Sequence, residues 1–202
     1  MNVWIATRDC TVPFDAVVIG GSHGSFDLLL DVLPRWAAVE FPPLLMALHI
    51  PRGSTPDFVH HFSERCGCRM LEVEDKQRPA PNTVYLAPGG YHVLVERDRS
   101  LSLSSDGPVN HAQPSIDVLF ESAAMVFGHG LLGVLLTGAS ADGARGLARI
   151  QALGGTTVVQ SPDSAVAATM PEAALACCRP DHVVAAGRLG RFIADLINRG
   201  ID

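Results

Sequence analysis

The segment Val17–Ser25 reads Val-Val-Ile-Gly-Gly-Ser-His-Gly-Ser, so an apolar run stops abruptly in a cluster of glycine, serine and histidine. Continuous apolar runs, in contrast to alternating ones, are typical of strands covered on both faces, as in a parallel sheet. The residues that follow place Phe26, Leu29 and Leu33 at a spacing near 3.6, which predicts a helix over Ser25–Trp36. A buried strand, a glycine-rich turn and a helix together predict an α/β fold.

The same alternation continues along the chain. Strands are expected at Ala16–Gly20, Leu44–Ile50, Thr83–Ala87, Gly133–Gly138, Thr156–Gln160 and His182–Ala185. Further helices are expected at Thr55–Cys66, Ser115–Phe127, Asp142–Leu153, Pro171–Cys178 and Gly190–Asn198. The runs Tyr91–Glu96 and Leu101–Ser104 break this rhythm and predict an inserted β-hairpin. We therefore expect an α/β sandwich with a mainly parallel sheet and a small inserted β-hairpin.

The composition is that of a globular protein, because 48% of the 202 residues are hydrophobic and 18% are charged. The formal net charge is −6 and no basic stripe is present, so nucleic acid is not an expected partner. The N-terminus lacks the pattern of a secretion signal, and no apolar stretch approaches the ~20 residues of a membrane span. We expect a cytoplasmic protein without membrane insertion.

The cysteines do not predict a disulfide framework, because their number, five, is odd and no secretion signal is seen. Cys66-Gly67-Cys68 is half of a zinc-site pattern, but no second ligand pair stands at a suitable spacing. We expect small, half-buried thiols, no metal and no cofactor.

Three polar side chains follow three of the expected strands. They are Ser22, His49 and Asp142. Active sites of open parallel sheets lie beyond the carboxyl ends of the strands, so these side chains are expected to meet. A serine hydroxyl needs a base to become a nucleophile, an imidazole suits that role, and a carboxylate can hold the imidazole in its tautomer. Taken singly, Ser22 and Asp142 fit helix caps and His49 fits a structural residue.

The segment Gly20–Gly24 matches G-x-S-x-G, the sharp turn between strand and helix that exposes a nucleophilic serine. The amide of His23 and the start of the following helix are expected to stabilise an oxyanion beside Gly21. The glycine spacing fits neither of the common phosphate-binding motifs, so a nucleotide-binding protein is a weaker hypothesis.

From about Phe14 to Ile197 the sequence resembles the catalytic domain of CheB-type chemotaxis protein-glutamate methylesterases. The matching blocks are Val17–Ser22, His49–Pro51, Tyr85–His92, Pro114–Phe120 and Val134–Gly146. The resemblance implies a doubly wound three-layer sandwich. We expect one domain over residues 1–202, with a core at about 14–197, and without the receiver domain of the family. The resemblance also implies a serine hydrolase that cleaves glutamate γ-methyl esters on chemoreceptors, and in some members deamidates glutamine.

Residue by residue, the resemblance assigns Ser22 as nucleophile, His49 as base and Asp142 as the acid of the triad. It places the amides of His23 and Ala139 at the oxyanion. The family usually has threonine where His23 stands. Ala139 replaces methionine, which predicts a wider pocket or a lost substrate contact.

These departures leave a second hypothesis, a non-catalytic CheB-like module that binds a receptor or signalling partner. The expected partner is in either case a methylated chemoreceptor or a similar signalling protein. Three other histidine positions carry weaker expectations: His23 is a second site imidazole or a surface residue, His92 is structural or lies at the cleft rim, and the pair His60-His61 is solvated.

Overall fold

The protein is built around a seven-stranded sheet, described by a computed structural model of residues 14–36, 38 and 40–199. Its strands are β1 (Ala16–Gly21), β2 (Leu44–Leu48), β3 (Arg69–Glu72), β4 (Thr83–Leu86), β7 (Leu131–Leu135), β8 (Thr156–Gln160) and β9 (His182–Val184). They lie in the order β3-β4-β2-β1-β7-β8-β9, and every neighbouring pair is parallel. The chain therefore builds outward from β1 in one direction and later in the other, as in doubly wound folds.

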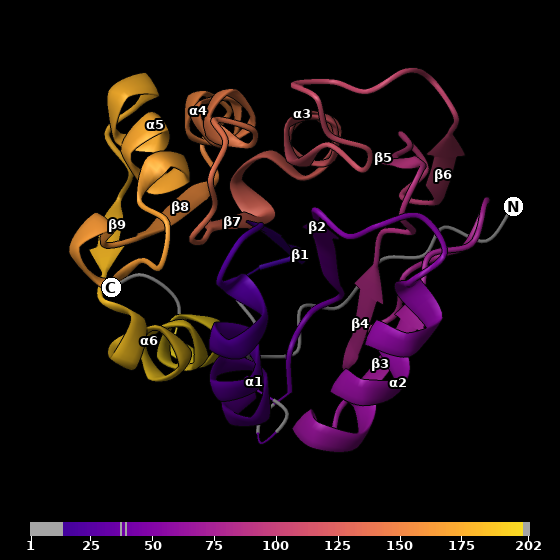
Figure 1. The fold of residues 1–202 in the computed structure, drawn as a ribbon, viewed down its shortest axis with the longest axis horizontal. Coiled ribbons are helices and arrows are strands. Elements are labelled where there is room, and N and C mark those ends of the chain that lie inside the picture. Colours follow the sequence, from indigo (N-terminus) through magenta and orange to yellow (C-terminus); the bar gives the residue numbers. More distant parts are fainter. Residues whose placement is uncertain (1–13, 37, 39, 200–202) are drawn as a thin grey trace, which may run out of the picture.

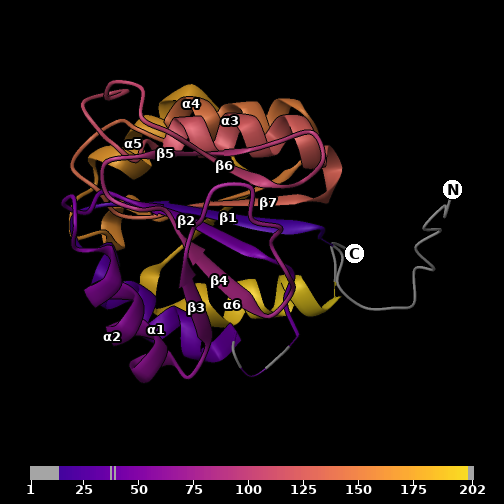
Figure 2. The ribbon, with the colours of Figure 1, turned by 90° about the vertical axis from the view of Figure 1, so that its right-hand side faces the viewer.

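Helices cover both faces of this sheet, which confirms the predicted three-layer sandwich (Figure 1). They are α1 (Ser25–Trp36), α2 (Thr55–Cys66), α3 (Ile116–Phe127), α4 (Ala144–Ala152), α5 (Thr169–Cys177) and α6 (Ala186–Arg199), with short 3-10 turns η1 (Gly128–Gly130) and η2 (Pro162–Ser164). Figure 2 shows α1, α2 and α6 on one face and α3, α4 and α5 on the other. The predicted hairpin, β5 (His92–Val95) and β6 (Leu101–Ser104), lies on the α3 side.

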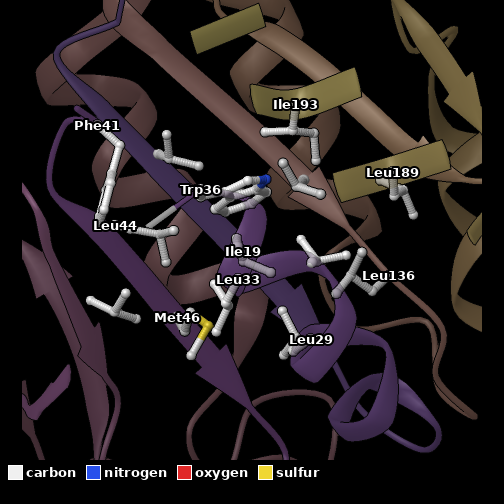
Figure 3. Packing of buried hydrophobic residues seen from close by; sticks show 14 of the residues in the cluster. Ile19, Leu29, Leu33, Trp36, Phe41, Leu44, Met46, Leu136, Leu189 and Ile193 are labelled. Carbon is white, nitrogen blue, oxygen red and sulfur yellow. The ribbon is translucent and has the colours of Figure 1, made fainter. Parts of the chain in front are cut away.

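Each face of the sheet has its own hydrophobic core, which explains why the β1 sequence is apolar without alternation. Figure 3 shows the core on the α1 side, where Ile19 of β1 packs near Leu33 and Trp36 of α1. The Trp36 indole also donates a hydrogen bond to the Gly190 carbonyl at 3.0 Å, which ties α1 to α6. On the other face, Val18 packs into the core under α3 and α4.

Most predicted elements are present, with three differences. Strand β7 lies at Leu131–Leu135 instead of Gly133–Gly138, because the chain beyond it turns into a loop. Strand β3, at the sheet edge, was not predicted, since it has only four residues and its two apolar side chains, Met70 and Leu71, lie between charged ones without alternation. Helix α6 begins at Ala186, earlier than the predicted Gly190. Within the described residues no helix is long and apolar enough to cross a membrane.

Candidate active site

The sheet register brings Ser22 and His49 next to each other at the carboxyl edge. Their preceding residues, Gly21 and Leu48, are partners in the β1–β2 pair, and the His49 amide donates to the Gly21 carbonyl at 3.3 Å. On the other side of β1, the Ser22 amide donates to the Thr137 carbonyl at 3.0 Å. The three loops after β1, β2 and β7 thus converge where the strand order changes direction, the usual position of a ligand site in such sheets.

The turn that carries Ser22 requires glycines because its neighbours pack against the backbone. A Cβ on Gly20 would lie 2.2 Å from Cγ2 of Ile116, and a Cβ on Gly21 would lie 2.7 Å from Cβ of Ser25. Both the amide and the hydroxyl of Ser25 donate to the Ser22 carbonyl, at 3.0 and 2.6 Å. These contacts fix the turn at the start of α1 and leave the Ser22 side chain half-buried.

Asp142 is fully buried, and its carboxylate is surrounded by hydrogen-bond donors. The donors are His49 Nε2 at 2.9 Å, the Ile116 amide at 2.7 Å, the Ser115 hydroxyl at 2.8 Å, Asn110 Nδ2 at 3.1 Å and the Asp117 amide at 3.2 Å. Two of these donors are the first free amides of α3, where the helix dipole also favours a negative charge. The alternative that Asp142 caps the helix that follows it is therefore wrong. Helix α4 has no side-chain cap, and Asp142 instead binds the start of α3.

The same donors decide the ionisation of Asp142. Burial by itself raises its pKa, but the hydrogen bonds from His49, the Ile116 amide and their neighbours outweigh burial and hold the pKa below the ordinary value of 3.8. Asp142 is consequently a carboxylate at neutral pH and can only accept hydrogen bonds.

An ionised Asp142 fixes the tautomer of His49. The bond of 2.9 Å joins Oδ2 to Nε2, so Nε2 carries the hydrogen and Nδ1 keeps the free lone pair of the neutral ring. The His49 side chain is 18% exposed, which leaves it reachable from solvent. Among the described residues no hydrogen bond joins the Ser22 hydroxyl to His49. Such contacts are often loose without substrate.

The loop that carries Asp142 is held in place by Thr137 and Gln160. The buried Gln160 amide accepts a hydrogen bond from the Thr137 N–H at 2.8 Å and donates to the Ser164 carbonyl at 3.1 Å. The Thr137 hydroxyl contacts the His23 carbonyl at 3.0 Å and accepts from the Ala167 amide at 2.8 Å. Three loops are thereby joined: the serine turn, the loop after β7 and the segment after β8.

The residues predicted at the oxyanion lie at the surface of this junction. The His23 and Ala139 side chains are exposed, whereas Gly21 is buried at the end of β1. Within the described residues, the structure records no acceptor for the amide N–H of either His23 or Ala139.

The other predicted histidines have structural surroundings. His92 is buried, accepts a hydrogen bond from the Ser115 amide at 3.1 Å and pairs through Nε2 with the Gly107 carbonyl. It lies in the interior and not at a cleft rim, and it supports Ser115. His60 is exposed and pairs with Glu64 at 3.6 Å, while the His61 ring stacks on Phe26. His60 is thus solvated as predicted, whereas His61 is only partly exposed.

Potential metal ligands do not gather in the part of the chain that the structure describes: no group of three or more histidine, cysteine or acidic side chains could hold an ion. Cys66 and Cys68 are buried, and burial, followed by the neighbouring Cys68 thiol, raises the pKa of Cys66 to about 11. These thiols are protonated and unreactive at neutral pH. Cys10 lies outside the described residues.

Sequence reasoning missed the donors around Asp142. The block Pro114–Phe120 contains Ser115 and the first amides of α3, but nothing in this local sequence indicates a carboxylate partner. Asn110 lies in a loop and gave no signal. Gln160 ends a predicted strand and was read only as part of it.

Known proteins share the sequence pattern of this chain. Residues 17–193 match the family model described as CheB methylesterase. A protein of Leptospira interrogans named "Putative protein-glutamate methylesterase/protein-glutamine glutaminase" is 35% identical over 189 residues, which cover 94% of this chain and 98% of that protein. A methylesterase/glutaminase "of group 3 operon" from Bradyrhizobium diazoefficiens is 39% identical over 153 residues, 74% of this chain but 42% of that protein.

The fold has a counterpart among solved structures. The CheB methylesterase catalytic domain of Thermotoga maritima superposes with a TM-score of 0.85 at 24% identity, covering 91% of this chain and 99% of that one. At that identity the similarity concerns the fold. The chain spans about half the length of another relative, from Bordetella bronchiseptica, to which it is 36% identical.

Proposed function

The chain belongs to the CheB methylesterase family, whose members are carboxylic ester hydrolases, and from that premise we propose that it hydrolyses glutamate γ-methyl esters on a chemoreceptor or a related signalling protein. The observation that carries the proposal is the pair of the buried Asp142 and the half-buried His49, held 2.9 Å apart beside the turn that presents Ser22. We assign one domain to the chain, with its core at about residues 14–197. The site would use no metal or cofactor.

In the acylation step, the Ser22 hydroxyl attacks the ester carbonyl while His49 takes its proton. Because Nε2 is bound to Asp142, the accepting atom is Nδ1. The carbonyl oxygen of the ester gains negative charge, and the amides of His23 and Ala139 would donate hydrogen bonds to it. Asp142 stabilises the imidazolium that forms, and collapse of the intermediate releases methanol with the proton from His49.

In the deacylation step, water enters where methanol has left. Nδ1 of His49 takes a proton from this water, whose oxygen attacks the acyl carbon. The second tetrahedral intermediate breaks down by expelling Ser22, which recovers its proton from His49. The products are a glutamate carboxylate and the free enzyme.

The names of the relatives include a second reaction, that of a protein-glutamine glutaminase, in which the leaving group differs. The same steps with a glutamine amide would release ammonia, protonated by His49. No additional residue is needed, so we propose deamidation as a slower reaction of the same site.

The experiment is methanol release from a methylated receptor fragment by wild type and by Ser22→Ala. We expect a loss of about 10³-fold or more in kcat, since removal of a triad nucleophile has effects of this order. Ser63→Ala, on the surface of α2, is the matched control. Equal methanol release by wild type and Ser22→Ala would overturn Ser22 as the nucleophile. No methanol release by wild type, together with no labelling of Ser22 by a fluorophosphonate in the folded protein, would favour the non-catalytic binding module.

A further inference from the structure

A second buried carboxylate lies behind Asp142. Asp117, in the first turn of α3, is only 3% exposed. Its Oδ1 accepts the Gly146 amide of α4 at 2.7 Å, and its Oδ2 accepts Nδ2 of Asn110 at 2.8 Å. Both oxygens are therefore occupied, and neither contacts His49 or Ser22.

The Asn110 amide connects the two carboxylates. Its Nδ2 lies 2.8 Å from Oδ2 of Asp117 and 3.1 Å from Oδ1 of Asp142. A side-chain amide nitrogen carries two hydrogens, so it can donate one to each carboxylate at the same time. The Asn110 side chain is exposed and comes from a loop, so without Asp117 the described contacts would leave it only Asp142 to hold it.

We propose that Asp117 is a positioning residue of the hydrolytic site, which holds the Asn110 amide against Asp142 and so keeps the Asp142 carboxylate aligned with Nε2 of His49. The expected effect on kcat rests on the proposed hydrolysis. The expected effect on the tautomer of the His49 ring does not.

The electrostatic surroundings of Asp117 oppose its ionisation and do not by themselves stabilise the fold. Burial raises its pKa, and the negative charges of Asp142 and Glu121 raise it further, against the hydrogen bonds from Gly146 and Asn110. Of the nearby charged groups, Glu121 is paired with Arg145 of α4 at 3.5 Å, and His49 lies beyond Asp142. The negative charge of Asp117, buried beside that of Asp142, is thus costly for folding, and such conflicts occur at functional sites.

The kinetic test compares Asp117→Asn, Asn110→Ala and the double variant with wild type. Asp117→Asn keeps the size of the side chain but turns one acceptor oxygen into a donor, so it cannot hold both Gly146 and Asn110. We expect kcat for ester hydrolysis to fall about tenfold in each single variant, as for other residues that orient a catalytic ligand, with KM within about twofold. Because Asp117 acts through Asn110, the double variant should be no slower than Asn110→Ala.

Glu121→Gln is the matched control, since it removes a neighbouring charge from the same helix without touching Asn110. We expect it to keep the wild-type kcat. A wild-type kcat in Asp117→Asn, or losses that multiply in the double variant, would overturn the proposal. If Asp117→Asn does not fold, Asn110→Ala decides alone, because truncating an exposed loop side chain leaves the core intact.

A second readout does not depend on activity. The ¹⁵N NMR signals of the His49 ring report which nitrogen carries the proton, and wild type should show it on Nε2. In Asp117→Asn and Asn110→Ala we expect a mixture of the two tautomers, and an unchanged spectrum in both contradicts the inference. The two proposals can fail separately. If the variants show this tautomer change but the wild-type protein releases no methanol, the proposed function is overturned and the role of Asp117 stands.

Discussion

The carboxylate of Asp142 accepts the backbone amide of Ile116 at 2.7 Å, so an acid from the loop before α4 closes the N-terminus of α3. The same carboxylate binds His49 through the same oxygen, Oδ2. The alignment of His49, the proposed base, therefore depends on where α3 begins, and the packing of α3 against α4 supports the proposed active site. This coupling leads to the first two predictions.

Replacing Asp142 by Asn should abolish most activity without unfolding the protein. The amide retains one oxygen for the α3 amides but presents its NH₂ group or a weaker acceptor to His49, so the ring loses its preferred tautomer. We expect kcat to fall about 10⁴-fold, as in other triads with this change. Methanol release and circular dichroism measure the two effects. Asp163→Asn, at an exposed position, serves as control, and a folded Asp142→Asn with more than a tenth of wild-type activity contradicts the assignment.

The stability of the protein should fall in acid because of Asp142. Its folded-state pKa is held below 3.8, so the unfolded chain takes up a proton first as the pH drops. The contribution of Asp142 is thus complete above its unfolded pKa and is lost as the pH falls through the folded one. Urea unfolding at pH 7 and at pH 3 measures this. The stability gap between wild type and Asp142→Asn should narrow in acid, and a gap that widens there contradicts the prediction.

The contribution of the Ser115 hydroxyl to stability can be measured separately from that of the α3 amides. Ser115→Ala removes the 2.8 Å hydrogen bond to a buried carboxylate, and a hydrogen bond to a charged group contributes about 1.5–3 kcal/mol. We expect the free energy of unfolding to fall by about that amount, with a reduced kcat. Ser122→Ala, which removes hydrogen bonds within α3 and to the β5 amide, is the comparison for stability, and it should keep wild-type kcat.

The sequence predicts where the residues of the proposed triad lie better than it predicts the residues that support Asp142, for a physical reason. Ser22, His49 and Asp142 each follow a buried apolar run, and parallel strands necessarily end at the same edge. Ser115 and Asn110 reach Asp142 only because α3 packs over β1, where Ile116 meets Gly20. That packing has no periodic signature in the chain.

The same limit explains the differences in the fold. Elements that are buried on one face or both, such as α1 and β8, were predicted close to their observed bounds, because burial imposes the periodicity that sequence patterns reveal. Strand β3 lies at the sheet edge with Arg69 exposed, and its short mixed sequence carries no such pattern.

The closest packing at the site predicts the effect of a single methyl group. A Cβ on Gly20 would lie 2.2 Å from Cγ2 of Ile116, the residue whose amide binds Asp142. Gly20→Ala must therefore push the start of α3 away from β1, and overpacking of this kind costs about 1–3 kcal/mol. Urea unfolding should show that loss of stability. Methanol release should also fall, because a displaced Ile116 amide shifts Asp142 and, through Asp142, the His49 ring.

Gly187 provides the control for this substitution, since among the described residues no atom beyond its own turn of α6 lies within 4 Å of a Cβ at that position. Gly187→Ala should raise stability by up to about 1 kcal/mol through helix propensity, with unchanged activity. If Gly20→Ala proves as stable and as active as Gly187→Ala, the start of α3 can shift without disturbing the base. The link between helix packing and the Asp142 carboxylate would then be weaker than the 2.7 Å contact to Ile116 indicates.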